Sequence, residues 1–173
     1  LASEWLAEEV KYNSKADFLN DKLASIGNSG ISGAEPRDVV LYGFGRIGRV
    51  AARELIKQAG KGQQLRLRAI VTRSSKDADI IKRASLLRND SVHGAFKGSV
   101  IEDLDKKALV INGQLVHMIS ANTPEEIDYT TYGIMNALVI DNTGVYTNRE
   151  ALARHLSSKG AAKVLLTAPG KEI

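Results

Sequence analysis

The feature that most constrains this chain is a glycine-rich turn, Gly43-Phe44-Gly45-Arg46-Ile47-Gly48, between a short apolar segment and a helical pattern. Residues 39–41 are apolar, as in a buried strand, and an amphipathic periodicity then runs to about residue 59. A second strand pattern follows within about 30 residues, which completes the context of a dinucleotide-binding turn. The sequence therefore predicts a doubly wound α/β domain, although the same glycines are also compatible with a tight turn that binds nothing.

Each glycine of this turn has its own expected role. Gly43 permits the tight turn, Gly45 lets the backbone approach a pyrophosphate, and Gly48 lets the helix pack closely against the strand. The N-terminus of the helix offers free N–H groups and a partial positive charge to phosphates. Arg46, in the first turn of that helix, adds a cation. These residues form the phosphate-binding part of the predicted site.

The rest of the chain alternates strand and helix patterns. We expect strands at 65–71, 137–140 and 164–167, helices at 79–87 and 148–157, and a short helix opened by Thr123-Pro124. Between residues 99 and 119, Asn112-Gly113 separates two apolar runs, which is typical of a hairpin. This alternation predicts a Rossmann-type, doubly wound parallel sheet.

The same periodicities predict which faces are buried. Helical spacing indicates that the helix after the glycine turn buries Ile47, Val50, Ala51 and Leu55. Strand spacing indicates a common face for the apolar residues of the second strand, Leu65, Leu67, Ala69 and Val71.

The first 35 residues differ in pattern from the rest. Residues 3–26 have helical spacing with a break near Asn13-Ser14, and Gly, Asn and Ser dominate 27–33, which is typical of a linker. We therefore predict a helical N-terminal extension with its linker over 1–35 and a nucleotide-binding domain over 36–173. The extension either packs on its own domain or a neighbouring subunit, or serves as a protein-interaction arm.

The loop after the second strand bears on the choice of cofactor. NAD sites usually place an acidic residue there, about 20 residues after the glycine turn, to bond the ribose 2′-hydroxyl. This loop reads Arg73, Ser74, Ser75 and Lys76, and the first acid is Asp77. Cations and hydroxyls favour a 2′-phosphate, so we predict NADP, or the use of both NADP and NAD. In the alternative, Asp77 or Asp79 folds back onto the ribose.

Charge and composition argue against several other functions, namely nucleic-acid binding, membrane insertion and metal binding. Residues 37–88 contain thirteen Lys or Arg and four Asp or Glu, which favours an anionic partner. Only Tyr42 and Phe44 are aromatic there, too few for a surface that stacks nucleic-acid bases. No apolar run is long enough to span a bilayer, and the chain has no cysteine for a disulfide, a thiolate metal site or a nucleophile. We expect no nucleic-acid partner, no membrane partner and no metal site.

Four motifs follow one another along residues 38–173: Tyr42-Gly-Phe-Gly-Arg-Ile-Gly-Arg49, Asn89-Asp-Ser-Val-His-Gly94 with Phe96-Lys97-Gly98, Asp141-Asn-Thr-Gly-Val-Tyr146, and Lys163-Val-Leu-Leu-Thr-Ala-Pro169. Together they resemble the glyceraldehyde-3-phosphate dehydrogenase family. The resemblance implies cofactor contacts from Arg46 and Ile47 at the pyrophosphate, Asn122 near the adenine, Thr143 and Gly144 along the groove, and Thr167 on the nicotinamide side. The family's ribose-binding Asp falls near 73–75, where this chain has none, and Asn122 stands where the family has an arginine.

The resemblance also implies a reaction. In this family a cysteine thiolate attacks the aldehyde of a sugar phosphate, a histidine raises its reactivity, hydride passes to the nicotinamide, and phosphate releases the acyl group. Both residues lie beyond the last strand of the pattern. This chain is therefore expected to be an incomplete NAD(P)-binding part, inactive alone, of a cytoplasmic, homotetrameric enzyme of glycolysis or gluconeogenesis.

Two alternatives remain at this point: an erythrose-4-phosphate dehydrogenase, which shares the motifs, and a non-catalytic NAD(P)-binding or partner-docking module. The three histidines do not occupy the family's catalytic position. We expect His93 in a turn or an interface, His117 on a strand and His155 on the surface of a helix.

Overall fold

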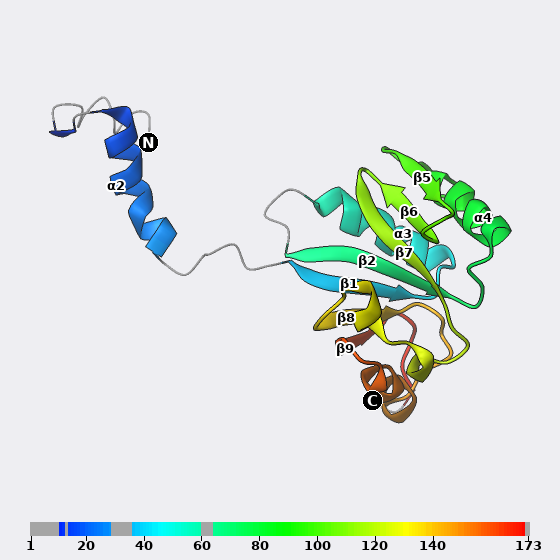
Figure 1. Cartoon of the computed structure of the whole chain (residues 1–173). Coiled ribbons are helices and arrows are strands. Elements are labelled where there is room, and N and C mark those ends of the chain that lie inside the picture. The colour runs from blue at the N-terminus through cyan, green and yellow to red at the C-terminus, as the bar shows by residue number, and fades with distance from the viewer. Residues whose placement is uncertain (1–10, 13, 29–35, 60–63, 172–173) are drawn as a thin grey trace. The chain divides into compact units, whose positions relative to one another are not determined.

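The computed structural model describes residues 11–12, 14–28, 36–59 and 64–171. The chain divides into two compact units, Leu1–Glu35 and Pro36–Ile173 (Figure 1). In the first unit, helix α2 spans Lys15–Asn28 and follows Ser14, whose Oγ accepts a hydrogen bond from the Asp17 amide at 3.1 Å. This is an N-cap, so the expected break in the helical pattern is confirmed.

The C-terminal end of α2 differs from the prediction. Gly27 and Asn28 were expected in the linker but belong to the helix. A glycine costs a helix only about 1 kcal/mol, so its presence does not require the helix to end. Residues 3–10 of the expected helix and 29–33 of the expected linker lie outside the described residues.

The second unit is built on a seven-stranded sheet with the order β5-β6-β7-β2-β1-β8-β9. The strands are β1 (Arg37–Tyr42), β2 (Leu65–Thr72), β5 (Val100–Asp103), β6 (Ala108–Ile111), β7 (Gln114–Ser120), β8 (Ala137–Asp141) and β9 (Ala161–Leu166). From β7 to β9 all neighbours are parallel, whereas β5, β6 and β7 form an antiparallel meander at one edge. The Rossmann-type fold is thus confirmed, with a mostly parallel sheet.

The antiparallel edge follows from the predicted hairpin. Asn112 and Gly113, between β6 and β7, have φ of 48° and 82°, as a two-residue turn that reverses the chain requires. Such a short turn returns the chain directly beside the preceding strand, whereas parallel neighbours need a long crossover.

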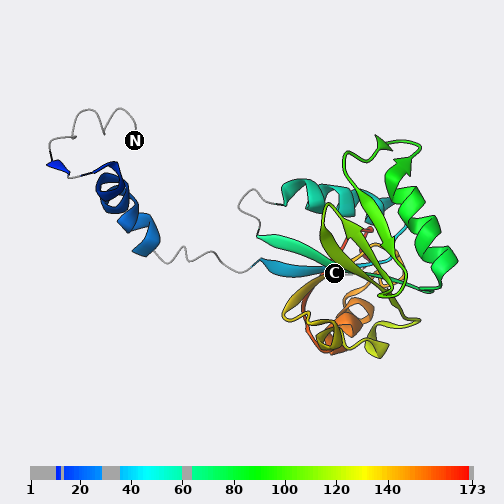
Figure 2. The ribbon, with the colours of Figure 1, turned by 45° about the horizontal axis from the view of Figure 1, so that its top comes forward.

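Helices cover both faces of the sheet (Figure 2). Helices α3 (Arg46–Gln58) and α4 (Asp77–Arg88) pack on one face, in a core with Leu41 and Leu67. On the other face lie the short helices η2 (Pro124–Glu126), η3 (Tyr129–Tyr132), α5 (Arg149–Ala153) and η4 (Arg154–Ser157). Their core includes Tyr129 and Tyr146. A separate pair, β3 (Asn89–Asp90) and β4 (Gly94–Ala95), follows α4.

The buried face of α3 is not the expected one. The helix buries Gly48, Ala52 and Ile56, whereas Ile47, which we expected inside, is 54% exposed. Ala51 and Leu55 are partly buried beside the core. Small residues one turn apart let α3 approach the sheet closely, so the helix is rotated toward Gly48 and away from the larger Ile47.

The inward face of β2 also differs from the prediction. Val39 pairs with Leu67 but Val40 pairs with Ala69, so Arg68 is an extra residue, a β-bulge. Beyond a bulge the alternation of the strand is reversed. Leu67 therefore packs with the α3–α4 face while Ala69 and Val71 pack with the opposite face, although simple alternation would put all three on one side.

None of the helices formed by the described residues is long and apolar enough to cross a membrane.

Asp90 organises the turn between β3 and β4. Its carboxylate accepts hydrogen bonds from the amides of His93 and Val92, each at 3.0 Å, and from the Arg49 guanidinium at 3.2 Å. These bonds, with the His93 side chain, hold the pKa of Asp90 well below its usual range. His93 thus lies in a turn, as expected.

We expect Asp90→Asn to weaken the acid dependence of folding stability. A carboxyl whose folded-state pKa is lowered stabilises the fold fully above its unfolded-state pKa of about 4, and that contribution is lost as the pH falls toward the folded-state value. Thermal unfolding measured from about pH 7 to about pH 3 should show a smaller fall in midpoint for the variant than for the wild type. Parallel curves would contradict this role of Asp90.

Candidate cofactor-binding site

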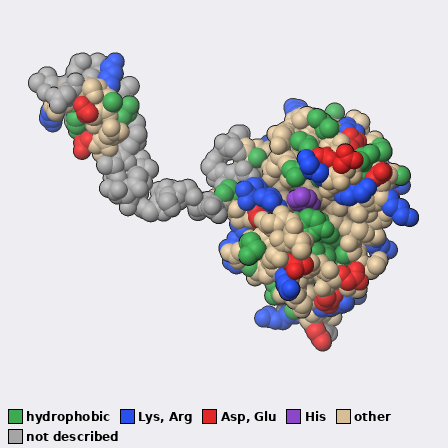
Figure 3. All heavy atoms as spheres, in the orientation of Figure 1, with side chains coloured by type: hydrophobic (Ala, Val, Ile, Leu, Met, Phe, Trp, Pro, Cys, Tyr) green, Lys and Arg blue, Asp and Glu red, His purple; other side chains and the backbone are tan. Residues whose placement is uncertain are grey.

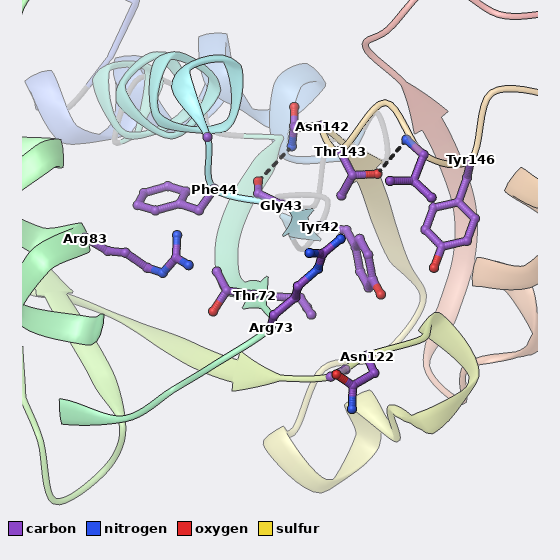
Figure 4. Close-up of a pocket in the computed structure, with 14 residues that line it drawn as sticks. Tyr42, Gly43, Phe44, Thr72, Arg73, Arg83, Asn122, Asn142, Thr143 and Tyr146 are labelled. Carbon is purple, nitrogen blue, oxygen red and sulfur yellow. Dashed lines mark hydrogen bonds between the residues drawn. The ribbon is translucent and has the colours of Figure 1, made fainter. Parts of the chain in front are cut away.

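The strongest functional candidate is a cavity of about 390 Å³ at the carboxyl ends of β1, β2, β7 and β8 (Figure 4). From β1 the chain passes to β2 on one side, whereas β8 lies on the other side of β1, so the strand order reverses here. Ligands of open α/β sheets bind at such a reversal point. The lining residues are Tyr42, Gly43, Phe44, Gly45, Val71, Thr72, Arg73, Arg83, Ala121, Asn122, Asn142, Thr143, Val145 and Tyr146.

The glycine turn has the geometry that its predicted roles require. Gly43 has φ of 90°, a left-handed conformation that favours glycine. A Cβ on Gly48 would lie 2.4 Å from the Gly43 carbonyl oxygen, so only glycine fits under the turn. Gly45 is the N-cap of α3, and a Cβ there would meet no atom within 4 Å. The space beside Gly45 therefore lies open to a ligand at the helix N-terminus, where phosphates are favoured.

The opposite wall is the turn after β8. Asn142 donates a hydrogen bond to the Gly43 carbonyl at 3.5 Å and Thr143 packs against Gly43, which ties the two turns together. Asp141 accepts hydrogen bonds from the amide and the hydroxyl of Thr143, both at 2.7 Å. This wall is fixed from behind by a carboxylate that does not itself line the cavity.

That carboxylate is held by His155. The Nε2 of His155 lies 2.8 Å from Oδ2 of Asp141, and both side chains are fully buried. The rings of Tyr42 and Tyr146 meet the imidazole edge-on, with centroids 4.6 and 5.1 Å away. Burial, followed by the neighbouring Tyr146, raises the pKa of Tyr42 above its usual value. Our prediction of a surface position for His155 is therefore wrong: η4 turns it inward to satisfy Asp141.

The cationic loop after β2 lines a neighbouring hollow rather than the main cavity alone. Arg73 borders both, whereas Ser74, Ser75 and Lys76 border only the second, with Lys107 and Ser120. The Ser74 hydroxyl donates a hydrogen bond to the Asp79 carboxylate, and the Lys107 ammonium donates a hydrogen bond to the Asp77 carboxylate. Both acids are thus engaged away from the cavity. Neither Asp77 nor Asp79 lines the main cavity.

The structure brings together part of the predicted site. Gly43, Gly45, Arg73, Asn122 and Thr143 line the cavity, and Gly48 supports the turn from below. Arg46 and Ile47 are exposed in the first turn of α3, and Gly144 adjoins Thr143 with φ of 68°. The hydroxyl of Thr167 donates to the Asp141 carbonyl at 3.0 Å, outside the cavity lining.

Several lining residues were missed. Four of them lie inside the motifs already singled out, so their position beside the two turns could have indicated that they line the cavity: Tyr42, Phe44, Asn142 and Tyr146. Arg83 had no such signal, because it lies in the middle of α4 and reaches the cavity through the tertiary fold.

The basic stretch 37–88 does not form a uniform cationic surface. Arg49, Arg66 and Arg88 form ion pairs with Asp90, Asp38 and Glu102. On the face drawn in Figure 3, Lys and Arg side chains are interspersed with Asp and Glu. Among the described residues, no group of three or more His, Asp or Glu side chains is arranged to hold a metal ion.

Comparison with known proteins gives the family of the chain. The family model for the glyceraldehyde 3-phosphate dehydrogenase NAD binding domain matches residues 37–149. A glyceraldehyde-3-phosphate dehydrogenase-like protein of Pseudomonas aeruginosa (strain UCBPP-PA14) is 52% identical over 156 residues, 90% of this chain and 34% of that protein. The glyceraldehyde-3-phosphate dehydrogenase of Streptococcus pyogenes is 35% identical over 132 residues, 76% of this chain and 36% of that protein.

The chain thus spans about a third of the length of these curated relatives. The match to the Pseudomonas protein is longer than Pro36–Ile173, so it includes part of Leu1–Glu35. The match of the NAD-binding model covers most of the chain, including the glycine turn and the wall after β8. The chain therefore belongs to the glyceraldehyde-3-phosphate dehydrogenase family, and residues 37–149 correspond to the NAD-binding domain of that family.

Proposed function

We propose that this chain is the NADP-preferring cofactor-binding part of a phosphorylating glyceraldehyde-3-phosphate dehydrogenase that forms homo-oligomers in the cytoplasm. The observation that carries the cofactor choice is the composition of the cavity. Its lining contains two arginines, Arg73 and Arg83, and no carboxylate. A carboxylate at the end of β2 would bond a ribose 2′-hydroxyl and repel a 2′-phosphate, so cations without an acid favour NADP.

The residues present fit a dinucleotide. The open space at Gly45, which a side chain would occupy, adjoins the N-terminus of α3 and suits the pyrophosphate. Thr143 and Asn142 hold the wall beyond it, and Asn122 stands at the end of β7, on the side proposed for the adenine. When bound, the nicotinamide accepts a hydride. The chain's own residues bind and orient the dinucleotide; the thiolate of the family reaction is not among them, since the chain has no cysteine.

Gly45→Ala tests the binding function. Because a Cβ at Gly45 meets nothing within 4 Å and its φ is −74°, the fold should accept alanine with an unchanged unfolding midpoint. The methyl group would intrude where the pyrophosphate approaches, at a cost of about 1–3 kcal/mol, so the Kd for NADP should rise about 10- to 100-fold. Isothermal titration measures this. Gly45→Val, with a larger side chain, should weaken binding further, and unchanged affinity in both variants would refute the proposed site.

The proposed reaction is tested in the full-length parent protein. With NADP and inorganic phosphate, glyceraldehyde 3-phosphate should be oxidised with a higher kcat/KM than erythrose 4-phosphate. A higher value for erythrose 4-phosphate would replace the substrate. Absence of turnover with both aldehydes, in a protein that binds NADP, would instead establish a non-catalytic binding module.

A further inference from the structure

Arg83 is a cation in the cavity wall that the family motifs do not account for. It stands on α4, and its side chain reaches the cavity beside Phe44 and Thr72 (Figure 4). Among the described residues, its Nε is buried and has no hydrogen-bond partner. A buried polar group without a partner is costly, so such a group at a ligand cavity points to a partner that the ligand supplies.

The charged groups around Arg83 do not compensate its positive charge. Burial lowers its pKa, and the attraction of Asp79 opposes that effect only in part. The carboxylate of Asp79 already accepts a hydrogen bond from Ser74. Arg49, the other charged neighbour, repels Arg83 and is paired with Asp90. The site around Arg83 is therefore short of negative charge.

A second guanidinium borders the same space. Arg73 follows the last residue of β2, Thr72, and lines the cavity, and in the view of Figure 4 the guanidinium groups of Arg73 and Arg83 lie on either side of Thr72. Arg73 is exposed, so it adds positive charge at little desolvation cost. A planar guanidinium group can bind two oxygens of one phosphate at the same time, which a lysine cannot do.

We propose that Arg83, together with Arg73, binds the 2′-phosphate of NADP and sets the preference of this chain for NADP over NAD. This inference rests on the proposed function. The pyrophosphate belongs at Gly45 and the N-terminus of α3, whereas the end of β2 is where a Rossmann domain reads the ribose of the adenosine. A second anion-binding position at the end of β2 therefore matches the phosphate on that ribose.

This assignment differs from the loop predicted from the sequence. The Ser74 hydroxyl already donates a hydrogen bond to Asp79, and Ser75 and Lys76 border only the neighbouring hollow. The proposed determinant of cofactor preference thus keeps Arg73 of the loop and adds Arg83 of α4. It leaves Lys82, which is exposed on α4 beside Arg83 and does not line the cavity, as a matched control.

The test compares Arg83→Gln, Arg83→Lys, Lys76→Gln and Lys82→Gln by titration with NADP, NAD and 2′,5′-ADP. Loss of charge-assisted hydrogen bonds should raise the Kd of Arg83→Gln for NADP and 2′,5′-ADP by about 10- to 100-fold, with NAD affected less than about threefold. Arg83→Lys, which keeps the charge without the planar fork, should lie between. Lys76→Gln and Lys82→Gln should bind NADP within about threefold of the wild type.

Each contrary result has a distinct meaning. Equal losses for NAD and NADP would overturn the inference, because Arg83 would then act on a part that both cofactors share. A larger effect of Lys76→Gln than of Arg83→Gln would overturn it in favour of the loop as the binding site of the 2′-phosphate. A wild type that binds NAD more tightly than NADP would also overturn it, because the chain would then have no preference for NADP to explain. Failure of the wild type to bind either cofactor would instead refute the proposed function itself.

Discussion

Gly48→Ala is expected to destabilise the domain by about 3 kcal/mol and to abolish NADP binding, although it adds one methyl group. The new Cβ would lie 2.4 Å from the Gly43 carbonyl oxygen and 3.3 Å from its carbonyl carbon. Gly43 cannot easily yield, because its amide donates to the Val71 carbonyl at 2.9 Å and its φ is 90°. Overpacking against a fixed backbone costs about 1–3 kcal/mol, and any relief moves the turn that binds the cofactor.

Gly45→Ala is the matched control for this prediction, because it adds the same methyl group to the same turn where nothing lies within 4 Å. Urea unfolding should separate the two variants: Gly48→Ala loses stability and binding together, whereas Gly45→Ala loses binding alone. If both variants kept the stability of the wild type, the close approach of α3 to the turn would not be a constraint on folding.

His155→Leu is expected to cost a similar or larger amount, about 3–5 kcal/mol, for a different reason. The substitution leaves Oδ2 of Asp141 without its partner, in a site where both side chains are fully buried. Removal of one member of a buried pair is more costly than removal of both, because an unpaired buried charge remains. Asp141 also holds Thr143, so the wall of the cavity should loosen and NADP should bind more weakly.

His117→Leu provides the comparison. His117 lies on β7, as expected from the sequence, and is only partly buried beside the ring of Tyr132. Burial, followed by repulsion from Arg68, lowers its pKa, so it is neutral at pH 7 and its loss strands no charge. We expect less than about 1 kcal/mol by chemical denaturation. Equal losses in the two histidine variants would show that the Asp141 pair adds nothing beyond packing.

The sequence predicted the elements of the fold better than their orientation. The glycine turn, the hairpin at Asn112-Gly113 and the strands of the sheet depend on local backbone preferences and short periods, which the sequence carries directly. The inward face of β2 could not be read in this way, because the bulge at Arg68 reverses the alternation without any glycine or proline to announce it. The rotation of α3 toward Gly48 is likewise decided by the surface on which the helix packs.

The residues of the candidate site likewise fall into those that sequence motifs predict and those that depend on tertiary packing. Gly43, Gly45 and Thr143 were found from motifs, because the two turns that they form place them at the cavity whatever the rest of the chain does. Arg83 and the His155–Asp141 pair were not, since their roles depend on which helix face meets which strand end. Such residues become visible only when buried polar atoms are matched with their partners.

The contact between Asn142 and Gly43 joins residues 99 positions apart, and this separation has a consequence for the order in which the protein matures. A nascent chain that has emerged only as far as β7 contains the whole glycine turn but not the strand that closes the cavity over it. Closure of so long a loop is entropically slow and follows local structure. We therefore expect the nicotinamide dinucleotide to bind late in biogenesis, so that it stabilises the finished domain but cannot template its early intermediates.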